Sequence, residues 1–226
     1  MKTPKHLKRL FEGWPELVCF DLDGTLVDSV PDIAAAMDKS LVAMGASPAG
    51  EERVRGWVGY GSAKLVQQAM EWANLPAERI EEGYKLFLKE YFDNLAGSST
   101  LYANVESILK AFKYQKVPVA LITNKPSLFI KPLLDHFGIS TYFSWMLGGD
   151  SLAEKKPSPL PLLHCMEDIE AAPDKCLMVG DSLADYRAAK AAGFKCALVT
   201  YGYNHGVDLK ELEADVLIDD LAELLM

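Results

Sequence analysis

The chain has 226 residues, about half of them hydrophobic, which suits one large globular domain or one domain that carries a smaller one. Asp and Glu number 32 against 23 Lys and Arg, and the net charge of −9 excludes a general nucleic-acid-binding surface. No apolar stretch approaches the roughly 20 residues of a membrane span, so no membrane partner is expected.

The amino-terminal residues and the cysteines bear on where the protein works. The first ten residues carry four basic side chains, at Lys2, Lys5, Lys8 and Arg9. Because residues 11–15 do not form an apolar signal-peptide region, we expect a solvated basic leader. None of the four cysteines forms a Cys-x-x-Cys pair, which indicates buried, reduced thiols in a cytoplasmic protein.

Six short apolar runs have the length and composition of buried parallel strands. They are residues 17–20, 117–122, 143–147, 176–179, 196–199 and 216–218. Helical patterns lie between them; one follows Asn104, a candidate N-cap, and another covers residues 127–137 and ends at Gly138. Strands that alternate with helices predict an α/β domain with a three-layer, Rossmann-like core around a parallel sheet.

The alternation is interrupted between the first two strands. Residues 28–96 contain no clear strand and three helical patterns, at 33–44, 65–72 and 80–91, where one or two helices would suffice. We therefore expect two domains: a catalytic core of residues 1–27 and 97–226, and an inserted all-helical cap of residues 28–96. Ser29 with Asp32 is a candidate capping box for the first helix, and residues 97–99 are a candidate flexible linker.

A pair of carboxylates, Asp21 and Asp23, ends the first strand-like run. Side chains two residues apart share a strand face, and two close carboxylates repel each other unless a cation or a shared proton intervenes. On this segment alone, a plain Asp-Gly turn is as good an interpretation as nucleophilic and acid–base chemistry beside a metal ion. A calcium loop fits poorly, because Leu26 and Val27 stand where oxygen ligands would continue.

Polar residues also follow three other strand-like runs, where parallel sheets bind their ligands. They are Thr123, Asn124, Lys125, Lys155, Lys156, Asp181 and Asp185. Together with the first pair they supply acids, a hydroxyl and an ammonium at one rim of the sheet, an inventory that suits Mg²⁺-assisted phosphoryl transfer. We expect Lys125 to be a charge on the rim and Lys155 to face solvent.

In this order the four groups resemble the motifs of the haloacid dehalogenase (HAD) superfamily of phosphotransferases. Residues 21–25 are similar to its Asp-x-Asp-Gly-Thr motif, Thr123 to its second motif, Lys156 before Pro157 to its third, and residues 180–185 to its fourth. The resemblance covers nearly the whole chain, and the helical insertion is similar to the C1 cap of the family. It implies a small phosphorylated metabolite as substrate.

The resemblance also assigns a role to each motif residue. Asp21 would be the nucleophile that forms an aspartyl-phosphate, and Asp23 would protonate the leaving alkoxide and then activate the hydrolytic water. Thr123 and the backbone N–H groups that follow, with Asn124 among the substrate-binding residues, would hold phosphoryl oxygens. Lys156 would neutralise the nucleophile and the phosphate.

The metal that the resemblance implies is Mg²⁺. Its ligands would be the carboxylates of Asp21 and Asp181 and the backbone carbonyl of Asp23. Asp185 would either ligate the ion or hold a water bound to it, and both roles stay open. Gly24 would allow the tight turn of the chain beside the bound substrate.

Within the family, residues 56–61, 123–125 and 201–204 look like segments of phosphoglycolate phosphatases. We therefore expect a Mg²⁺-dependent phosphate monoester hydrolase that acts on 2-phosphoglycolate or a similar small metabolite, as a monomer or a homodimer. One alternative is a phosphomutase of the β-phosphoglucomutase type, which shares the core motifs. The alternative from another class is a non-enzymatic phospho-receiver domain, which would have no use for the helical insertion.

Substrate choice is expected to depend on the cap. The segment around residues 56–61 is rich in glycine and is flanked by cations, so Arg55 and Lys64 are candidate ligands for a substrate carboxylate, with Arg53 beside them. Surface cations next to a helix-breaking turn are an equally good interpretation. We also expect the cap to open and close about residues near 27–30 and 94–100.

Overall fold

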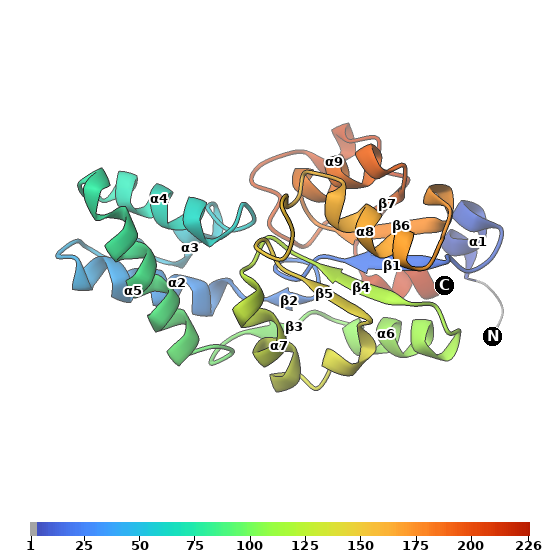
Figure 1. The fold of residues 1–226 in the computed structure, drawn as a ribbon, viewed down its shortest axis with the longest axis horizontal. Coiled ribbons are helices and arrows are strands. Elements are labelled where there is room, and N and C mark those ends of the chain that lie inside the picture. The colour runs from blue at the N-terminus through green and yellow to red at the C-terminus, as the bar shows by residue number, and fades with distance from the viewer. Residues whose placement is uncertain (1–3) are drawn as a thin grey trace.

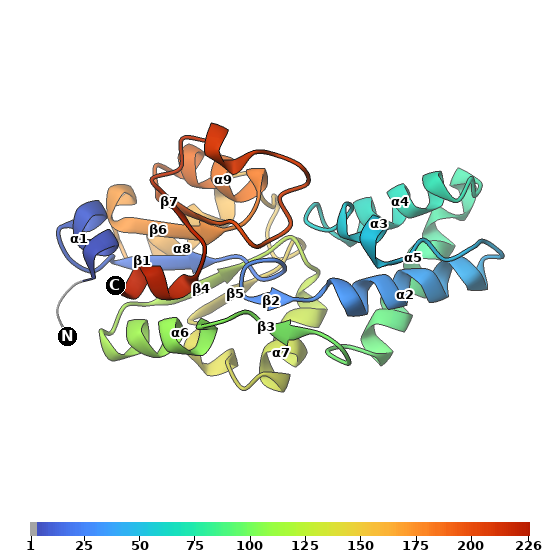
Figure 2. The same cartoon turned by 180° about the vertical axis from the view of Figure 1, so that it is seen from behind.

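The computed structural model describes residues 4–226, whose helices and strands form two units (Figure 1). The larger unit is a sheet with helices on both faces, and the smaller unit contains helices only and lies beyond one end of the sheet (Figure 1). Two short strands connect them, β2 (Val27–Asp28) and β3 (Thr100–Leu101), which pair antiparallel (Figure 2). The segment between these strands, residues 29–99, is called the helical insert below.

The sheet has six parallel strands in the order β5-β4-β1-β6-β7-β8. They are β1 (Leu17–Phe20), β4 (Val119–Ile122), β5 (Trp145–Leu147), β6 (Cys176–Gly180), β7 (Lys195–Val199) and β8 (Val216–Ile218). All six predicted strands exist, but two are shorter than expected, at 117–122 and 143–147. In the first, Pro118 has no N–H to donate, and it takes part only through its carbonyl, which accepts from Val18 N–H (3.1 Å).

The sheet is buried on both faces, which explains why its strands are continuous apolar runs. In β1, Val18 and Phe20 point into one hydrophobic cluster, and Leu17 and Cys19 point into another. The first cluster lies under α1 (Lys5–Phe11), α6 (Val105–Tyr114), α7 (Ser127–His136) and the 3₁₀ turn η5 (Leu221–Leu225), and the second under α8 (Leu160–Asp168) and α9 (Leu183–Ala192). The predicted three-layer α/β architecture is therefore confirmed. Short 3₁₀ turns lie at η2 (Ser140–Tyr142), η3 (Pro173–Lys175) and η4 (Leu209–Glu211).

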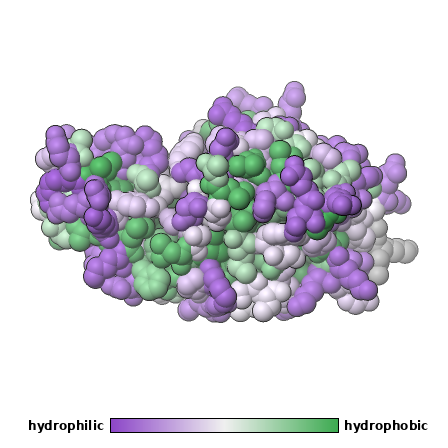
Figure 3. Space-filling model, in the orientation of Figure 1, coloured by the Kyte–Doolittle hydropathy of each residue, from purple (hydrophilic) through white to green (hydrophobic). Residues whose placement is uncertain are grey.

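The helical insert has a hydrophobic cluster largely its own, built mainly from its helices. These are α2 (Val30–Ala43), α3 (Glu51–Arg55), α4 (Ser62–Trp72) and α5 (Ile80–Asp93), with a 3₁₀ turn η1 (Ala77–Arg79) before α5. The sequence predicted three of these helices and missed α3, whose five residues are too few to show a period. Hydrophilic residues cover much of the outer end of the insert (Figure 3), whereas Phe87 and Tyr91 of α5 point inward.

Several local predictions failed for one reason: the side chains concerned make contacts with parts of the chain that lie far away in sequence. The basic side chains of the leader at Lys5, Lys8 and Arg9 are exposed, as expected, but the segment forms α1, because Leu7 and Phe11 are buried against the core; Lys2 lies outside the described residues. Asn104 precedes α6 but donates its side-chain amide to Asp220 (2.8 Å) instead of capping the helix.

The capping box predicted at the start of α2 is absent as well. Asp32 instead accepts the backbone N–H groups of Ser98 and Ser99, each at 2.8 Å, and Ser29 gives its hydroxyl to the site described below. The expected flexible linker at residues 97–99 is thus tied to α2 by a buried carboxylate.

The cysteines are all buried and free, in agreement with reduced thiols. Among residues 4–226, no helix combines the length and the apolar character that a membrane crossing requires.

Candidate active site

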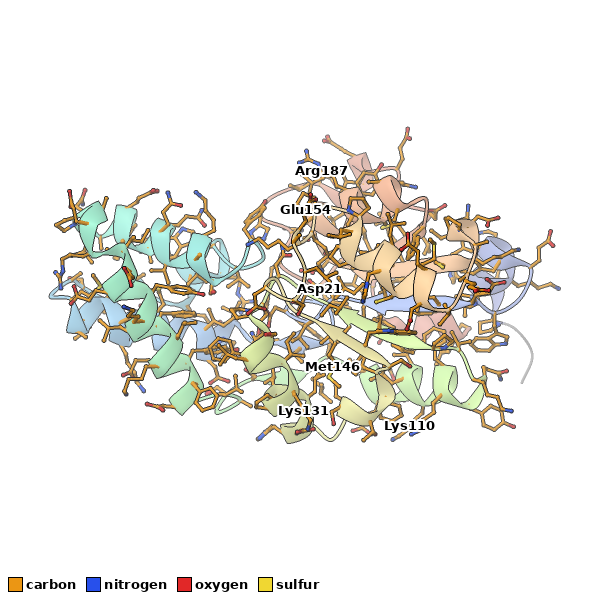
Figure 4. All side chains as sticks on the ribbon, viewed as in Figure 1. Asp21, Lys110, Lys131, Met146, Glu154 and Arg187 are labelled. Carbon is orange, nitrogen blue, oxygen red and sulfur yellow. The ribbon has the colours of Figure 1, made fainter. Side chains whose placement is uncertain are left out.

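The carboxyl ends of the central strands bring the predicted catalytic residues together. Sheet hydrogen bonding continues past the strands, because Asp21 N–H donates to Val179 O (2.9 Å) and Thr123 N–H donates to Leu147 O (3.0 Å). This fixes both residues at the rim of the sheet, where Asp21 lies near the boundary between the two units (Figure 4). Asp21, Asp23, Thr123, Lys156, Asp181 and Asp185 are all buried.

An ammonium group links two of the carboxylates. Lys156 Nζ lies 2.8 Å from Asp21 Oδ1 and 2.6 Å from Asp185 Oδ1. Both contacts are buried ion pairs of one ammonium with two carboxylates. Burial opposes the charge of Lys156, but the carboxylates of Asp185 and Asp21 outweigh it and raise its pKa. Burial raises the pKa of Asp21 to about 6 against the attraction of Lys156.

Three carboxylates form a group that could hold a cation. One oxygen from each of Asp21, Asp181 and Asp185 lies within 4.8 Å of the others. Burial raises the pKa of Asp181, and the charges of Asp185 and Asp21 raise it further. A single ammonium, Lys156, opposes these three acids, so the donor set fits a hard divalent ion such as Mg²⁺, which prefers oxygen ligands.

The two acids after β6 are held in different ways. Asp181 accepts Thr25 Oγ1–H (3.1 Å) and Tyr203 N–H (2.5 Å). Asp185 completes a capping box with Ser182 at the start of α9, in which its Oδ2 accepts the Ser182 N–H (3.0 Å) and hydroxyl (2.6 Å). Its other oxygen faces Lys156. Both Asp185 oxygens thus have protein partners, and this carboxylate positions Lys156 whichever of its two predicted metal roles applies.

Glycine is required where the chain passes the carboxylate of Asp181. Gly24 has φ +89°, and a Cβ on it would overlap Asp181 Oδ2. A Cβ on Gly202 would overlap the Asp181 side chain as well, and would lie 2.5 Å from Gly24 O. The backbone therefore closes around this acid from two sides.

Asp23 lies on the side of the site that faces the helical insert. Its Oδ1 accepts Ser29 Oγ–H (2.5 Å) and Lys125 Nζ–H (2.8 Å), and its Oδ2 also faces Lys125 (3.1 Å). Lys125 was expected to be a charge on the rim, and this was wrong: it is 6% exposed. Burial opposes its charge, but Asp23 and Tyr91 outweigh burial and raise its pKa. The ammonium also lies 4.7 Å from the centroid of the Tyr91 ring.

A pocket between the sheet rim and the helical insert contains about 470 Å³ of empty space, its open mouth included. The core lines it with Asp21, Asp23, Thr123, Asn124, Lys125, Pro126 and Phe129, and the insert with Ile33, Val58, Gly59, Gly61, Ser62, Leu65, Phe87 and Tyr91. The wall formed by the insert is mostly apolar.

Two predicted substrate-binding residues do not line this pocket. Lys64 is exposed and lies 3.3 Å from Gln67 Oε1 on its own helix. Arg55 pairs with Glu51 (2.8 Å) and lies over the Tyr203 ring. One of the two interpretations of the sequence placed both residues at the substrate because they flank the glycine-rich turn; the other, surface cations beside that turn, agrees with their position outside the pocket. They flank it in sequence, but the turn presents backbone and small side chains to the pocket.

Core loops reach across and contact the insert. Asn124 donates its amide to Gly59 O and to Lys156 O, both at 3.0 Å. Lys155 is exposed, as expected, but donates to Tyr60 O (3.0 Å). Tyr203 donates its hydroxyl to Asp28 (2.6 Å) beside the entry to the insert. The insert is thus held against the rim that carries the carboxylates.

A sequence profile of haloacid dehalogenase-like hydrolases matches residues 18–199. The chain belongs to this family. Phosphoglycolate phosphatase 1 of Pseudomonas aeruginosa is 46% identical to this hydrolase over 215 residues, which cover 93% of this chain and 79% of that protein. The phosphoglycolate phosphatase of Nitrosococcus oceani is 43% identical over 214 residues, which cover 93% of this chain and 95% of that protein.

Solved structures agree with the family assignment. The crystal structure of a predicted phosphoglycolate phosphatase from Haemophilus somnus matches this hydrolase with a TM-score of 0.90 and 38% identity, over 93% of this chain and 96% of that chain. The family predicted from the four motifs is therefore confirmed, and membership of it sets aside the phospho-receiver alternative.

Four residues of the site in this hydrolase were not predicted: Ser29, Tyr91, Lys125 and Tyr203. Ser29 and Tyr91 belong to helical patterns, where a hydroxyl or an aromatic ring is usually a cap or a core residue. Lys125 carried a usable signal, because it lies three residues after the end of a strand and directly after two other site residues, Thr123 and Asn124. Tyr203 lay in a segment that resembled the family, but its contact with β2 depends on the fold.

Proposed function

We propose that this hydrolase is a Mg²⁺-dependent phosphatase that cleaves a small phosphate monoester through an aspartyl-phosphate, with 2-phosphoglycolate as the substrate. The observation that carries the proposal is the buried cluster in which Lys156 Nζ lies within 2.8 Å of both Asp21 and Asp185, with Asp181 beside them. The relatives named phosphoglycolate phosphatase support the choice of substrate.

In this proposal, Asp21 attacks phosphorus and Asp23 gives a proton to the departing alkoxide. Asp23 then takes a proton from water, which attacks the acyl phosphate and releases inorganic phosphate. Thr123 and the N–H groups after it hold phosphoryl oxygens, and Lys156 balances the charge that builds up around Asp21.

Mg²⁺ would be held by the carboxylates of Asp21 and Asp181 and the backbone carbonyl of Asp23, and when bound it neutralises the negative charge of the phosphate and the acids. Asp185 keeps Lys156 in place. Hydrolysis of phosphate monoesters needs accelerations of up to ~10²¹-fold, so nucleophile, acid and cation must act together.

The helical insert is proposed to act as a cap, with residues 28–96 as a domain separate from a core of residues 1–27 and 97–226. Its hydrophobic cluster is largely separate from those of the sheet, and the chain passes between the two units at β2 and β3. Closing such a cap excludes water from the reaction and completes the pocket. Solution scattering would detect opening about β2 and β3 as a larger radius of gyration without Mg²⁺ and a phosphate analogue; identical profiles in both states would contradict it.

The reduced cysteines favour the cytoplasm as the compartment in which the enzyme works.

A panel of phosphate esters, ranked by kcat/KM with and without Mg²⁺, tests the proposed function. We expect 2-phosphoglycolate to rank first, activity to disappear with a chelator, and Asp21→Asn to abolish turnover. Interconversion of sugar phosphates without release of phosphate would instead identify a phosphomutase. Release of phosphate by Asp21→Asn at the wild-type rate would contradict the mechanism.

A further inference from the structure

The pocket contains a buried cation that the mechanism above leaves without a task. Lys125 is the single cation among the described residues that line the pocket, and its side chain is 3% exposed. Its ammonium donates to the two carboxyl oxygens of Asp23 at 2.8 and 3.1 Å. A buried ammonium has a high desolvation cost, so its presence opposite the mostly apolar wall of the insert needs a reason.

The same pocket also holds polar atoms without partners. Tyr91 is 2% exposed and its hydroxyl has no hydrogen-bond partner of acceptable geometry within residues 4–226. Burial raises the pKa of Tyr91 to about 12, so the hydroxyl keeps its proton near neutral pH and can donate it. Asn124 Oδ1, in another residue that lines the pocket, also has no hydrogen-bond partner within residues 4–226. Buried polar atoms are rarely left unpaired, and a bound ligand is one explanation for such a group.

The unpaired hydroxyl and the ammonium lie next to each other. Lys125 Nζ is 4.7 Å from the centroid of the Tyr91 ring. The two groups come from different units, Lys125 from the loop after β4 and Tyr91 from α5 of the helical insert. An ammonium and a hydroxyl from two residues in contact can both donate to one carboxylate, with its two oxygens shared between them.

Building on the phosphatase function proposed above, we infer that Lys125 and Tyr91 bind an anionic leaving group, and so select esters whose alcohol carries a carboxylate. Asp23 marks where the leaving oxygen lies, since it gives the proton to that oxygen. In 2-phosphoglycolate one methylene separates this oxygen from the carboxylate, which therefore falls beside the ammonium that Asp23 contacts. In the complex, Lys125 therefore donates to the substrate carboxylate as well as to Asp23.

The apolar side chains of the pocket also limit which leaving groups can bind. Phe87 and Leu65 of the helical insert and Phe129 of α7 line the same pocket and offer no further hydrogen-bond donor. A leaving group with several hydroxyls would lose hydrogen bonds to water against these side chains and form none with them, which disfavours its binding. A short alcohol with one carboxylate can accept hydrogen bonds from both donors, Lys125 and Tyr91.

Two esters of nearly equal size test whether the enzyme recognises the negative charge on the leaving alcohol. We would compare kcat/KM for 2-phosphoglycolate and for 2-hydroxyethyl phosphate, whose leaving alcohol is uncharged, in the Mg²⁺-loaded enzyme. Lys125→Met is expected to lose about 100-fold more on the first ester than on the second, as for a buried charge partner. Tyr91→Phe is expected to lose about tenfold more, as for a hydrogen bond to a charged group. Lys85→Met, an exposed lysine on the helix of Tyr91, is the matched control and should leave the ratio unchanged.

The ratio decides between specificity and a general role. An equal loss on both esters in Lys125→Met would mean that Lys125 only supports Asp23, and would overturn the inference, as would a wild-type enzyme without preference for 2-phosphoglycolate. If the wild type cleaves neither ester, the proposed function fails separately. Calorimetric titration of Asp21→Asn with both esters then decides: a preference for 2-phosphoglycolate that Lys125→Met removes supports the inference, and equal affinities for the two esters overturn it.

Discussion

Lys156 balances buried acids, and removing its charge should be costly. Its side chain is 2% exposed, and those of its partners Asp185 and Asp21 are 0% and 12% exposed. In Lys156→Met the neighbouring carboxylates would remain buried without a counter-charge. Breaking a buried pair in this way costs about 3–5 kcal/mol. For a protein of this size each kcal/mol lowers Tm by about 2–4 °C, so we expect a fall of roughly 6–20 °C.

Thermal unfolding followed by circular dichroism at pH 7, with and without Mg²⁺, measures this loss. The adjacent lysine is a matched control, because Lys155 is exposed and its Nζ donates to a backbone carbonyl, Tyr60 O. Lys155→Met should change stability by less than about 0.5 kcal/mol. Mg²⁺ should recover part of the loss in Lys156→Met, since a cation among the same acids replaces some of the missing charge. Equal Tm values for the two variants would refute the charge-balance reasoning.

Three further outcomes are expected. Gly24→Ala should weaken Mg²⁺ binding in calorimetric titration, because a Cβ there overlaps the Asp181 carboxylate; wild-type affinity would contradict this crowding. Lys64→Met should keep kcat/KM for 2-phosphoglycolate within about twofold, since its side chain lies outside the pocket; a larger loss in the phosphate-release assay would return Lys64 to the binding site. Without metal, Tm should fall as pH rises from about 4 to 6, because the pKa of Asp21 is raised to about 6 by burial and the folded chain then holds a proton that the unfolded chain has released. Mg²⁺ should stabilise more as pH rises through this window, and a flat metal-free profile would argue against it.

The sheet and the catalytic acids were predictable because their signals are local. Four-residue runs such as residues 17–20 are apolar throughout, since both faces of the strand are covered. The acids follow directly in the chain, and the parallel sheet brings the strand ends to one rim. The spacing of Asp21 and Asp23 together with Lys156 therefore indicated the family before any coordinates.

The contacts of the insert were not predictable in the same way. Ser29 and Asp32 have the spacing of a capping box, yet each side chain pairs outside the helix, Ser29 with Asp23 of the preceding loop and Asp32 with Ser99, 67 residues away. Local hydrogen bonds and tertiary ones compete for the same polar atoms, and sequence spacing describes only the local ones.

Lys125 shows the same limit for a charge. A lysine in a loop is usually solvated, whereas this one is buried against Asp23 and the Tyr91 ring of α5. The burial that makes it a candidate for substrate recognition comes from a helix more than 30 residues away in the chain.

The account depends most directly on the side chain that becomes phosphorylated. Acid quench of the Mg²⁺-loaded enzyme during turnover of 2-phosphoglycolate, followed by reduction with tritiated borohydride and peptide mapping, labels an acyl phosphate at its carboxyl group. We predict that the label appears on Asp21 during turnover only, and that Asp21→Asn carries none. A label on another residue, or its absence from an enzyme that is turning over, would contradict the account.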